Sequence, residues 1–187
     1  MIIKSIDEQM KIVFLDVDGV LNCKTTEDVI WRDKGKMGIR GIDDSKVELL
    51  KKIIDSTGAR IVVSSTWRIN KVKNIFEDYV CFEDLDEKEY ADNSRKKRTA
   101  YDYLKKKLAA FKLKIYDDTP DCGGIYSRGK EIHSWLKEHP EVVNFVILDD
   151  EEFQDFYTYN LEDHVVYTSY RNGLTDQKVC EVIKILT

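Results

Sequence analysis

The sequence has little of what marks secreted, disulfide-rich or membrane-spanning chains. It holds 4 cysteines and 2 prolines in 187 residues, and no two cysteines form a CxxC pair. Scattered cysteines of this kind indicate reduced thiols and argue against a zinc site. No apolar run approaches the roughly 20 residues that span a bilayer, and the first residues lack the pattern of a signal peptide. We therefore expect a cytoplasmic protein without membrane association.

The composition is that of an ordinary globular chain, with 42% hydrophobic and 35% charged residues. A formal net charge of -5 argues against binding driven by total charge, but it leaves room for a local basic surface. The length predicts one domain over residues 1–187.

Short apolar segments alternate along the chain with amphipathic ones. Strands are predicted at 12–15, 59–65, 113–120, 144–150 and 164–169. Helices are predicted at 42–58, around Val72 and Ile75, at about 99–111, at 130–140 and at 175–186. Such alternation predicts an α/β fold, a three-layer α/β/α sandwich with a mainly parallel, Rossmann-like sheet.

Three further features refine this prediction. Asp44 or Ser45 is expected to cap the first helix, Gly58 to end it and Thr175 to cap the last. The glycine-containing segment 23–42 is interpreted as a flap over the site. Residues of about 80–98, which run from acidic to basic, are interpreted as a small surface insertion. No large cap domain is expected.

Polar side chains follow three of the predicted strands. These are Asp16 and Asp18, Ser64 and Ser65, and Asp149 and Asp150. In parallel sheets, ligands bind beyond the carboxyl ends of the strands. Two carboxylates at positions i and i+2 of a strand point to the same side, so they need a cation or a shared proton.

The motifs at these strand ends resemble a known family. "DVDGVLN" resembles the first motif of haloacid-dehalogenase-like (HAD-like) phosphatases, and "IVVSS", Lys130 at a helix start and "VILDD" follow in the family's order. "SSTWR", "RGKEIHSWL" and "VILDDEEF" are most similar to the HAD domain of Swiss Army Knife RNA repair-like proteins. The resemblance covers almost the whole chain and implies a phosphoric monoester hydrolase.

Phosphoryl transfer to a carboxylate needs an ionised nucleophile, a cation and donors around the phosphoryl oxygens. Asp16 is the predicted nucleophile and would form an aspartyl-phosphate. Asp18 would protonate the leaving oxygen and then activate water. Gly19 would let the backbone turn beside the phosphate.

The resemblance implies Mg²⁺ as the cofactor, held by Asp16, the Asp18 backbone carbonyl and the Asp149–Asp150 pair. We expect Asp150 to be the direct ligand and Asp149 an outer partner, although the sequence does not separate them. Carboxylates with water and substrate phosphate suit this ion.

Several side chains are candidates for the substrate phosphate. Ser64 would bond a phosphoryl oxygen, with Ser65 as the alternative, and Lys130 would offset the negative charge of nucleophile and phosphate. Arg68 is a further phosphate ligand, because guanidinium pairs well with phosphate. Weaker candidates are Arg32, Arg40 and Arg128.

The expected partner is a phosphorylated substrate, either a small molecule or a nucleic-acid end. The stretch 95–107 interleaves Tyr101 and Tyr103 with basic residues, so it could hold a nucleic-acid backbone while the tyrosines stack on bases. The alternative is a solvated helix face. Alternatives for the whole protein are a small-metabolite phosphatase, a phosphoprotein phosphatase, and a phosphate- or RNA-binding module without turnover.

Overall fold

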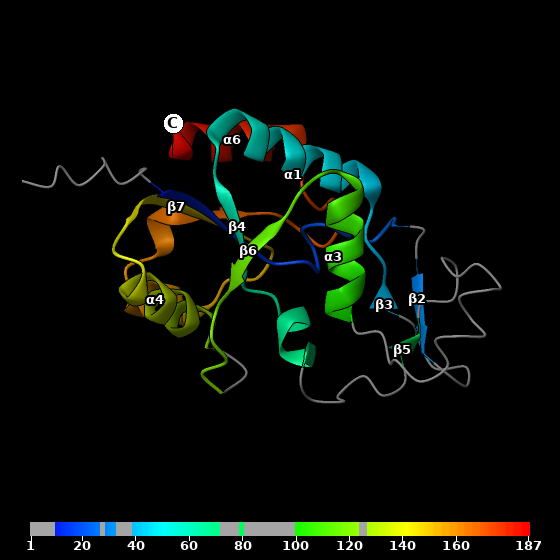
Figure 1. Ribbon diagram of the computed structural model, residues 1–187, viewed down its shortest axis with the longest axis horizontal. Helices are drawn as coiled ribbons and strands as arrows, with labels where there is room; N and C mark the ends of the chain where they lie inside the picture. The colour runs from blue at the N-terminus through cyan, green and yellow to red at the C-terminus, as the bar shows by residue number, and fades with distance from the viewer. Residues whose placement is uncertain (1–9, 27–28, 33–38, 72–78, 81–99, 124–126) are drawn as a thin grey trace, which may run out of the picture.

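A five-stranded parallel sheet forms the centre of the protein (Figure 1). The structure is a computed structural model that describes residues 10–26, 29–32, 39–71, 79–80, 100–123 and 127–187. The sheet order is β6-β4-β1-β7-β8. The strands are β1 (Met10–Leu15), β4 (Arg60–Val63), β6 (Ile115–Asp118), β7 (Val142–Asp149) and β8 (Val165–Tyr167). Because β1 lies between β4 and β7, the residues that follow it sit in the middle of the carboxyl edge.

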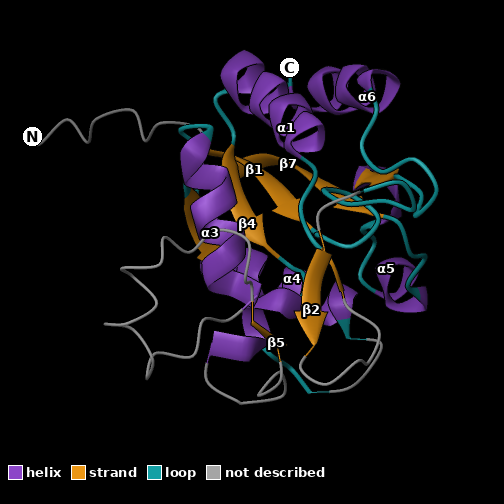
Figure 2. Ribbon diagram, turned by 90° about the vertical axis from the view of Figure 1, so that its right-hand side faces the viewer, coloured by secondary structure: helices purple, strands orange, loops and turns teal. Residues whose placement is uncertain are grey.

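Helices cover both faces of this sheet (Figures 1 and 2). The helical segments are α1 (Asp44–Thr57), η1 (Thr66–Lys71), α3 (Ala100–Ala110), α4 (Arg128–Glu138), α5 (Gln154–Thr158), η2 (Glu162–His164) and α6 (Asp176–Leu186). Alternate residues of β1 face opposite layers. Val13 and Leu15 pack in the core formed with α1, α3 and α6, whereas Ile12 and Phe14 pack with α4 and α5. The predicted three-layer α/β/α sandwich is confirmed.

A second, antiparallel sheet joins two segments whose pairing was not predicted. Its strands are β2 (Val29–Arg32), β3 (Ile39–Arg40) and β5 (Tyr79–Val80), in the order β3-β2-β5. Figure 2 shows β2 and β5 beyond the arrowheads of β1 and β4, on the side of their carboxyl ends. The predicted flap at 23–42 thus contributes two strands, while most of the insertion at 80–98 lies outside the described residues.

The helix ends follow local sequence signals with one shift. Asp43, rather than Asp44 or Ser45, caps α1, because its side chain accepts a hydrogen bond from the Ser45 amide. Gly58 ends α1 with a φ of 67°, and Thr175 caps α6, as predicted. The helix predicted around Val72 and Ile75 lies outside the described residues.

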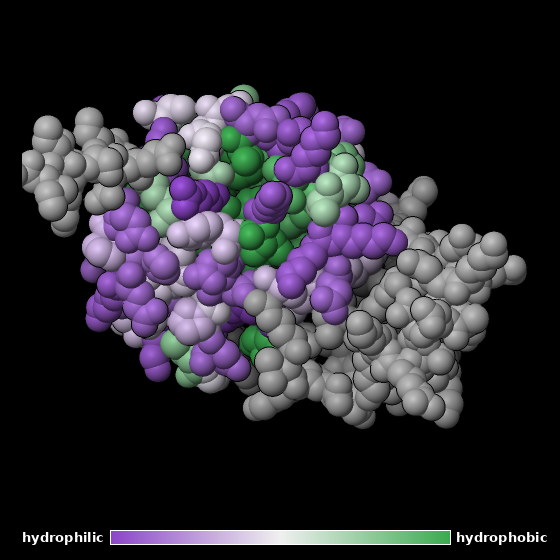
Figure 3. Space-filling model, viewed as in Figure 1, coloured by the Kyte–Doolittle hydropathy of each residue, from purple (hydrophilic) through white to green (hydrophobic). Residues whose placement is uncertain are grey.

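The described surface is mostly hydrophilic in the view of Figure 3, and apolar side chains show near the middle, where Figure 1 draws β4 and β6. Strand β6 is an edge of the main sheet, which explains why it is less buried than β1. Within the described ranges, no helix is both long enough and apolar enough to cross a membrane.

Candidate active site

Three carboxylates meet at the carboxyl ends of β1 and β7. Asp16, Asp149 and Asp150 each offer an oxygen atom, and these atoms lie within 4.8 Å of one another. The two strands are parallel neighbours, with Leu15 beside Leu148 in the register. Pairing of the strands therefore places the residues that follow at the same edge. Asp16 and Asp149 are 6% and 1% exposed, so water screens the repulsion between their charges only weakly.

Among the described residues, Arg128 forms ion pairs with both Asp16 and Asp149. Its Nη1 lies 3.1 Å from Asp16 Oδ1, 3.0 Å from Asp149 Oδ2 and 3.4 Å from Ser64 Oγ. Burial opposes its charge, but the charges of Asp16 and Asp149 outweigh this and raise the pKa of the guanidinium. The cation is thus fixed between the ends of β1, β4 and β7.

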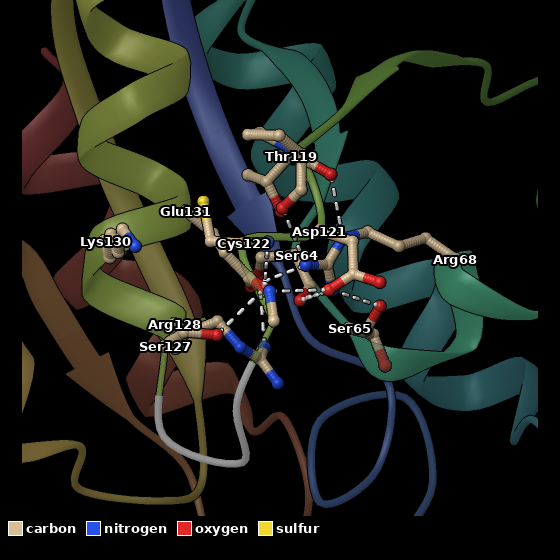
Figure 4. Close-up of polar contacts among 12 residues, drawn as sticks. Ser64, Ser65, Arg68, Thr119, Asp121, Cys122, Ser127, Arg128, Lys130 and Glu131 are labelled. Atoms are coloured by element: carbon tan, nitrogen blue, oxygen red, sulfur yellow. Dashed lines mark hydrogen bonds and ion pairs between the residues drawn. The ribbon is translucent and has the colours of Figure 1, made fainter.

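Lys130, the cation predicted for this position, lies apart from the carboxylates. The Lys130 side chain is exposed, and Figure 4 shows it on the side of α4 away from the labelled polar cluster. Successive helical residues are rotated by about 100°, so residues two positions apart point in nearly opposite directions. With Arg128 turned inward, Lys130 faces outward. Arg128 had been a weaker candidate for substrate binding.

One arginine does not balance the acidic groups around it. Burial, followed by the charge of Asp16, raises the pKa of Asp149, and the same two causes raise the pKa of Asp150 to about 6. Raised carboxyl pKa values indicate that the ionised forms lack sufficient cationic compensation. A set of oxygen donors with excess negative charge fits a hard divalent cation. The residues present therefore fit the Mg²⁺ that the family resemblance implies.

A tight turn at Gly19 allows Asp150 to approach the backbone. Gly19 has a φ of 70°, and a Cβ atom at this position would overlap the Asp150 carboxyl group. Thr168, which follows β8, donates a hydrogen bond of 2.7 Å to the Gly19 carbonyl. The Gly19 amide donates to Asn22 Oδ1 at 3.1 Å. The glycine predicted beside the phosphate thus makes room for the Asp150 carboxyl group.

Asp18 is held by two neutral donors. Asn22 Nδ2 donates to its Oδ1 and Trp67 Nε1 donates to its Oδ2, both at 2.8 Å. Burial raises the pKa of Asp18 and the nearby Asp16 charge adds to this effect, whereas both hydrogen bonds oppose it. The carboxyl group is fixed in orientation, and it lines the same cavity as Asp16.

The two serines after β4 differ in their surroundings. Ser64 is fully buried, and its Oγ lies near Arg128 Nη1. The Ser65 hydroxyl instead accepts a hydrogen bond from the Trp67 amide at 3.4 Å. The geometry therefore brings Ser64 to the carboxylate cluster and directs Ser65 toward the next turn.

The guanidinium of Arg68, which was predicted to bind phosphate, is bonded to other groups of the protein. Nε donates to the Thr119 carbonyl, Nη1 to two carbonyls, and Nη2 to the Pro120 carbonyl and to Glu131 Oε2 at 2.5 Å. A guanidinium has five N–H groups, and these contacts use all five. Arg68 therefore joins the ends of β4 and β6 to α4, as Figure 4 shows.

The described part of 95–107 also differs from the prediction. Tyr101 and Tyr103 are 3% and 8% exposed and belong to the core. The Tyr101 hydroxyl bonds Asp118, and the Tyr103 hydroxyl accepts from the Ile42 amide at 3.2 Å. These tyrosines are not platforms for bases. Lys105 lies over the Tyr101 ring, 4.5 Å from its centroid, as expected for a solvated helix face. Residues 95–99 are not among the residues that the structure describes, and the side chains of Arg32 and Arg40 are not described either.

The cluster opens into a cavity of about 270 Å³. Its lining residues are Asp16, Asp18, Thr66, Arg68, Ile69, Ser127, Arg128, Glu131, Asp149, Asp150, Glu151 and Phe153.

The contacts that Trp67, Asn22 and Glu131 make at this site were not predicted from the sequence. The sequence feature that accompanies the inward position of Arg128 is the glycine that follows it. A Cβ atom at Gly129 would lie 2.7 Å from the Asp155 backbone, so this turn of α4 packs closely on α5.

A central parallel sheet between two helical layers, with acidic residues at the ends of β1 and β7, defines a HAD-like α/β protein. A family model described as "HAD domain in Swiss Army Knife RNA repair proteins" matches residues 12–179, and the chain belongs to this family. Searches of curated proteins and of solved structures found no match. Family membership indicates a phosphatase-type hydrolase that acts on a phosphorylated substrate with a divalent metal.

Proposed function

We propose that this protein is a Mg²⁺-dependent phosphatase that hydrolyses a phosphomonoester through an aspartyl-phosphate on Asp16. The observation that carries the proposal is the convergence of Asp16, Asp149 and Asp150 around Arg128 at the carboxyl edge of the sheet. A nucleophilic carboxylate needs cations beside it, since its own charge and that of the phosphate repel each other.

The reaction proceeds in two halves. An Asp16 oxygen attacks phosphorus, the bond from phosphorus to the leaving oxygen breaks, and that oxygen takes the proton of Asp18. Asp18 then removes a proton from water as the water oxygen attacks phosphorus, which frees the Asp16 carboxylate and inorganic phosphate. One carboxyl group thus acts as acid and then as base.

Other side chains hold the phosphate in place. Arg128 offsets the charge on Asp16, and the Ser64 hydroxyl donates to a phosphoryl oxygen. Asp16, the Asp18 carbonyl and Asp150 would hold Mg²⁺, with Asp149 as an outer partner because it already pairs with Arg128 and accepts the Glu151 amide at 3.0 Å. The bound ion supplies charge stabilisation for the phosphoryl oxygens.

The proposed substrate is a phosphorylated nucleic-acid end or nucleotide. The family description refers to RNA repair proteins, which supports this choice. The exposed side chains of Lys105 and Lys106 on α3 would attract the phosphate backbone. Buried Tyr101 and Tyr103 leave this contribution to charge alone.

The test is release of phosphate from p-nitrophenyl phosphate and from 3'- and 5'-phosphorylated oligonucleotides, with Mg²⁺ and with a chelator. The variant Asp16→Asn should lower turnover by roughly 10³-fold or more. Asp55→Asn, the same change at an exposed site on α1, is the matched control and should keep full activity.

The outcomes separate the parts of the proposal. Turnover that survives in Asp16→Asn would exclude Asp16 as the nucleophile. Activity without any divalent metal would exclude the metal-assisted reaction. Hydrolysis of p-nitrophenyl phosphate but not of the phosphorylated oligonucleotides would retain the reaction and overturn the nucleic-acid substrate.

A further inference from the structure

Asp18 is clamped at both carboxylate oxygens by groups that only donate hydrogen bonds. Trp67 Nε1 donates to Oδ2 and Asn22 Nδ2 donates to Oδ1, each at 2.8 Å. The donors come from different elements: Trp67 lies in η1 after β4, and Asn22 follows the turn at Gly19.

The Trp67 side chain is itself held firmly. It is 1% exposed and belongs to the core that packs under α1 and α3. Its ring lies 6.4 Å from the Tyr103 ring at an interplanar angle of 42°. Because a packed indole cannot swing away, its N–H defines one position for the Asp18 oxygen.

Donor-only partners restrict where the acidic proton of Asp18 can point. An indole N–H and an amide N–H have no lone pair available to receive a proton. A protonated Asp18 therefore cannot direct its O–H toward Trp67 or Asn22. Within the described part of the chain, the O–H can instead point into the cavity that Asp18 lines together with Asp16 and Arg128.

We propose that Trp67, with Asn22, is a positioning residue that directs the Asp18 proton to the leaving-group oxygen. The inference rests on the proposed function. In the step concerned, the Asp18 O–H bond breaks and a new O–H bond forms on the leaving group. At the same time the bond from phosphorus to the leaving oxygen breaks and Asp16 takes its place on phosphorus.

The test compares phenyl phosphate with p-nitrophenyl phosphate as substrates of the full chain with Mg²⁺. The two esters are similar in size, but nitrophenolate leaves readily without a proton and phenolate does not. We expect Trp67→Phe, which keeps an aromatic side chain but removes the indole N–H, to lower kcat/KM by roughly tenfold or more for phenyl phosphate. For p-nitrophenyl phosphate the loss should stay within about threefold.

Trp135→Phe is the matched control. Trp135 is also buried, at 2% exposure, and its Nε1 donates to Asp117 Oδ2 at 2.7 Å, outside the residues that line the cavity. This variant loses the same kind of hydrogen bond, so it should leave the ratio of the two kcat/KM values unchanged. Asn22→Ala removes the second donor and should give the same leaving-group dependence as Trp67→Phe. Either variant therefore tests the proposal if the other fails to fold.

Two results would overturn the inference, and they are distinguishable. Equal losses on both esters in the folded Trp67 or Asn22 variant would mean that the residue supports the fold and not the proton transfer. If the wild-type chain showed no Asp16-dependent hydrolysis of either ester, the proposed function itself would fail, and the positioning role with it.

Discussion

At the scale of single residues, the rotation of α4 decides which basic side chain balances Asp16. Arg128 faces inward because Ile132 and Trp135, which follow it at helical spacing, pack against the sheet. Lys130 faces outward for the same reason. Charge compensation at the site therefore depends on how the apolar face of α4 is buried.

Replacing each of these two residues by methionine separates their roles. Arg128→Met should lower kcat/KM by roughly 10²-fold or more, because a fixed cation at the developing charge is lost. Lys130→Met should stay within about twofold, since its side chain is exposed. Steady-state kinetics at saturating Mg²⁺ measures both. A large loss in Lys130→Met with little change in Arg128→Met would restore the prediction made from sequence.

Part of the site could be predicted from the sequence, and the position of Arg128 could not. Asp16 and Asp149 were predicted to meet because apolar runs end there, and parallel pairing brings such ends together. The choice between Arg128 and Lys130 required the rotational phase of a helix whose first turn is fixed by packing on another element. Periodicity gave the helix but not the contact of Gly129 with Asp155.

At the scale of elements, a buried ion pair joins the ends of two strands of the main sheet to helix α4. Arg68 and Glu131 are 4% and 5% exposed, and Arg68 also bonds the carbonyls that end β4 and β6. Glu131 further accepts from Ser127 Oγ at 3.1 Å. The pair thus sets α4, and with it Arg128, relative to the strand ends.

Loss of the negative partner should destabilise the protein strongly. Glu131→Gln removes the carboxylate that pairs with the buried guanidinium of Arg68, and breaking such a pair costs about 3–5 kcal/mol of unfolding free energy. The same change at the exposed Lys51–Asp55 pair, Asp55→Asn, should cost about 1 kcal/mol or less. Urea unfolding measures both. Equal, small losses would mean that the backbone contacts of Arg68 alone hold α4 in place.

The small antiparallel sheet could not be predicted from the pattern of apolar and polar residues. Strands β3 and β5 are only two residues long, and β2 pairs with β5 across more than forty residues. Alternation of apolar and polar residues cannot identify such short segments. The long apolar runs of β1 and β7 carried a clear signal because both faces of the sheet are covered.

At the scale of the whole molecule, the acidic cluster couples folding to pH and to metal. The pKa of Asp150 rises to about 6 from its ordinary 3.8, and burial also raises the pKa of Asp149. Between about pH 4 and 6 the Asp150 carboxyl group therefore binds more protons in the folded chain than in the unfolded chain. The contribution of Asp150 to unfolding free energy is thus present at low pH and is lost as pH rises through this window.

A divalent cation should offset this loss, because it binds the ionised carboxylates and competes with protons. At one hundred times its dissociation constant, Mg²⁺ would add about 2.7 kcal/mol, a rise in Tm of about 5–10 °C. Thermal unfolding should show a larger Mg²⁺-induced rise at about pH 8 than at about pH 5. The rise should shrink in Asp150→Asn and persist in Asp55→Asn. An equal rise at both pH values, or in both variants, would place the bound ion away from this cluster.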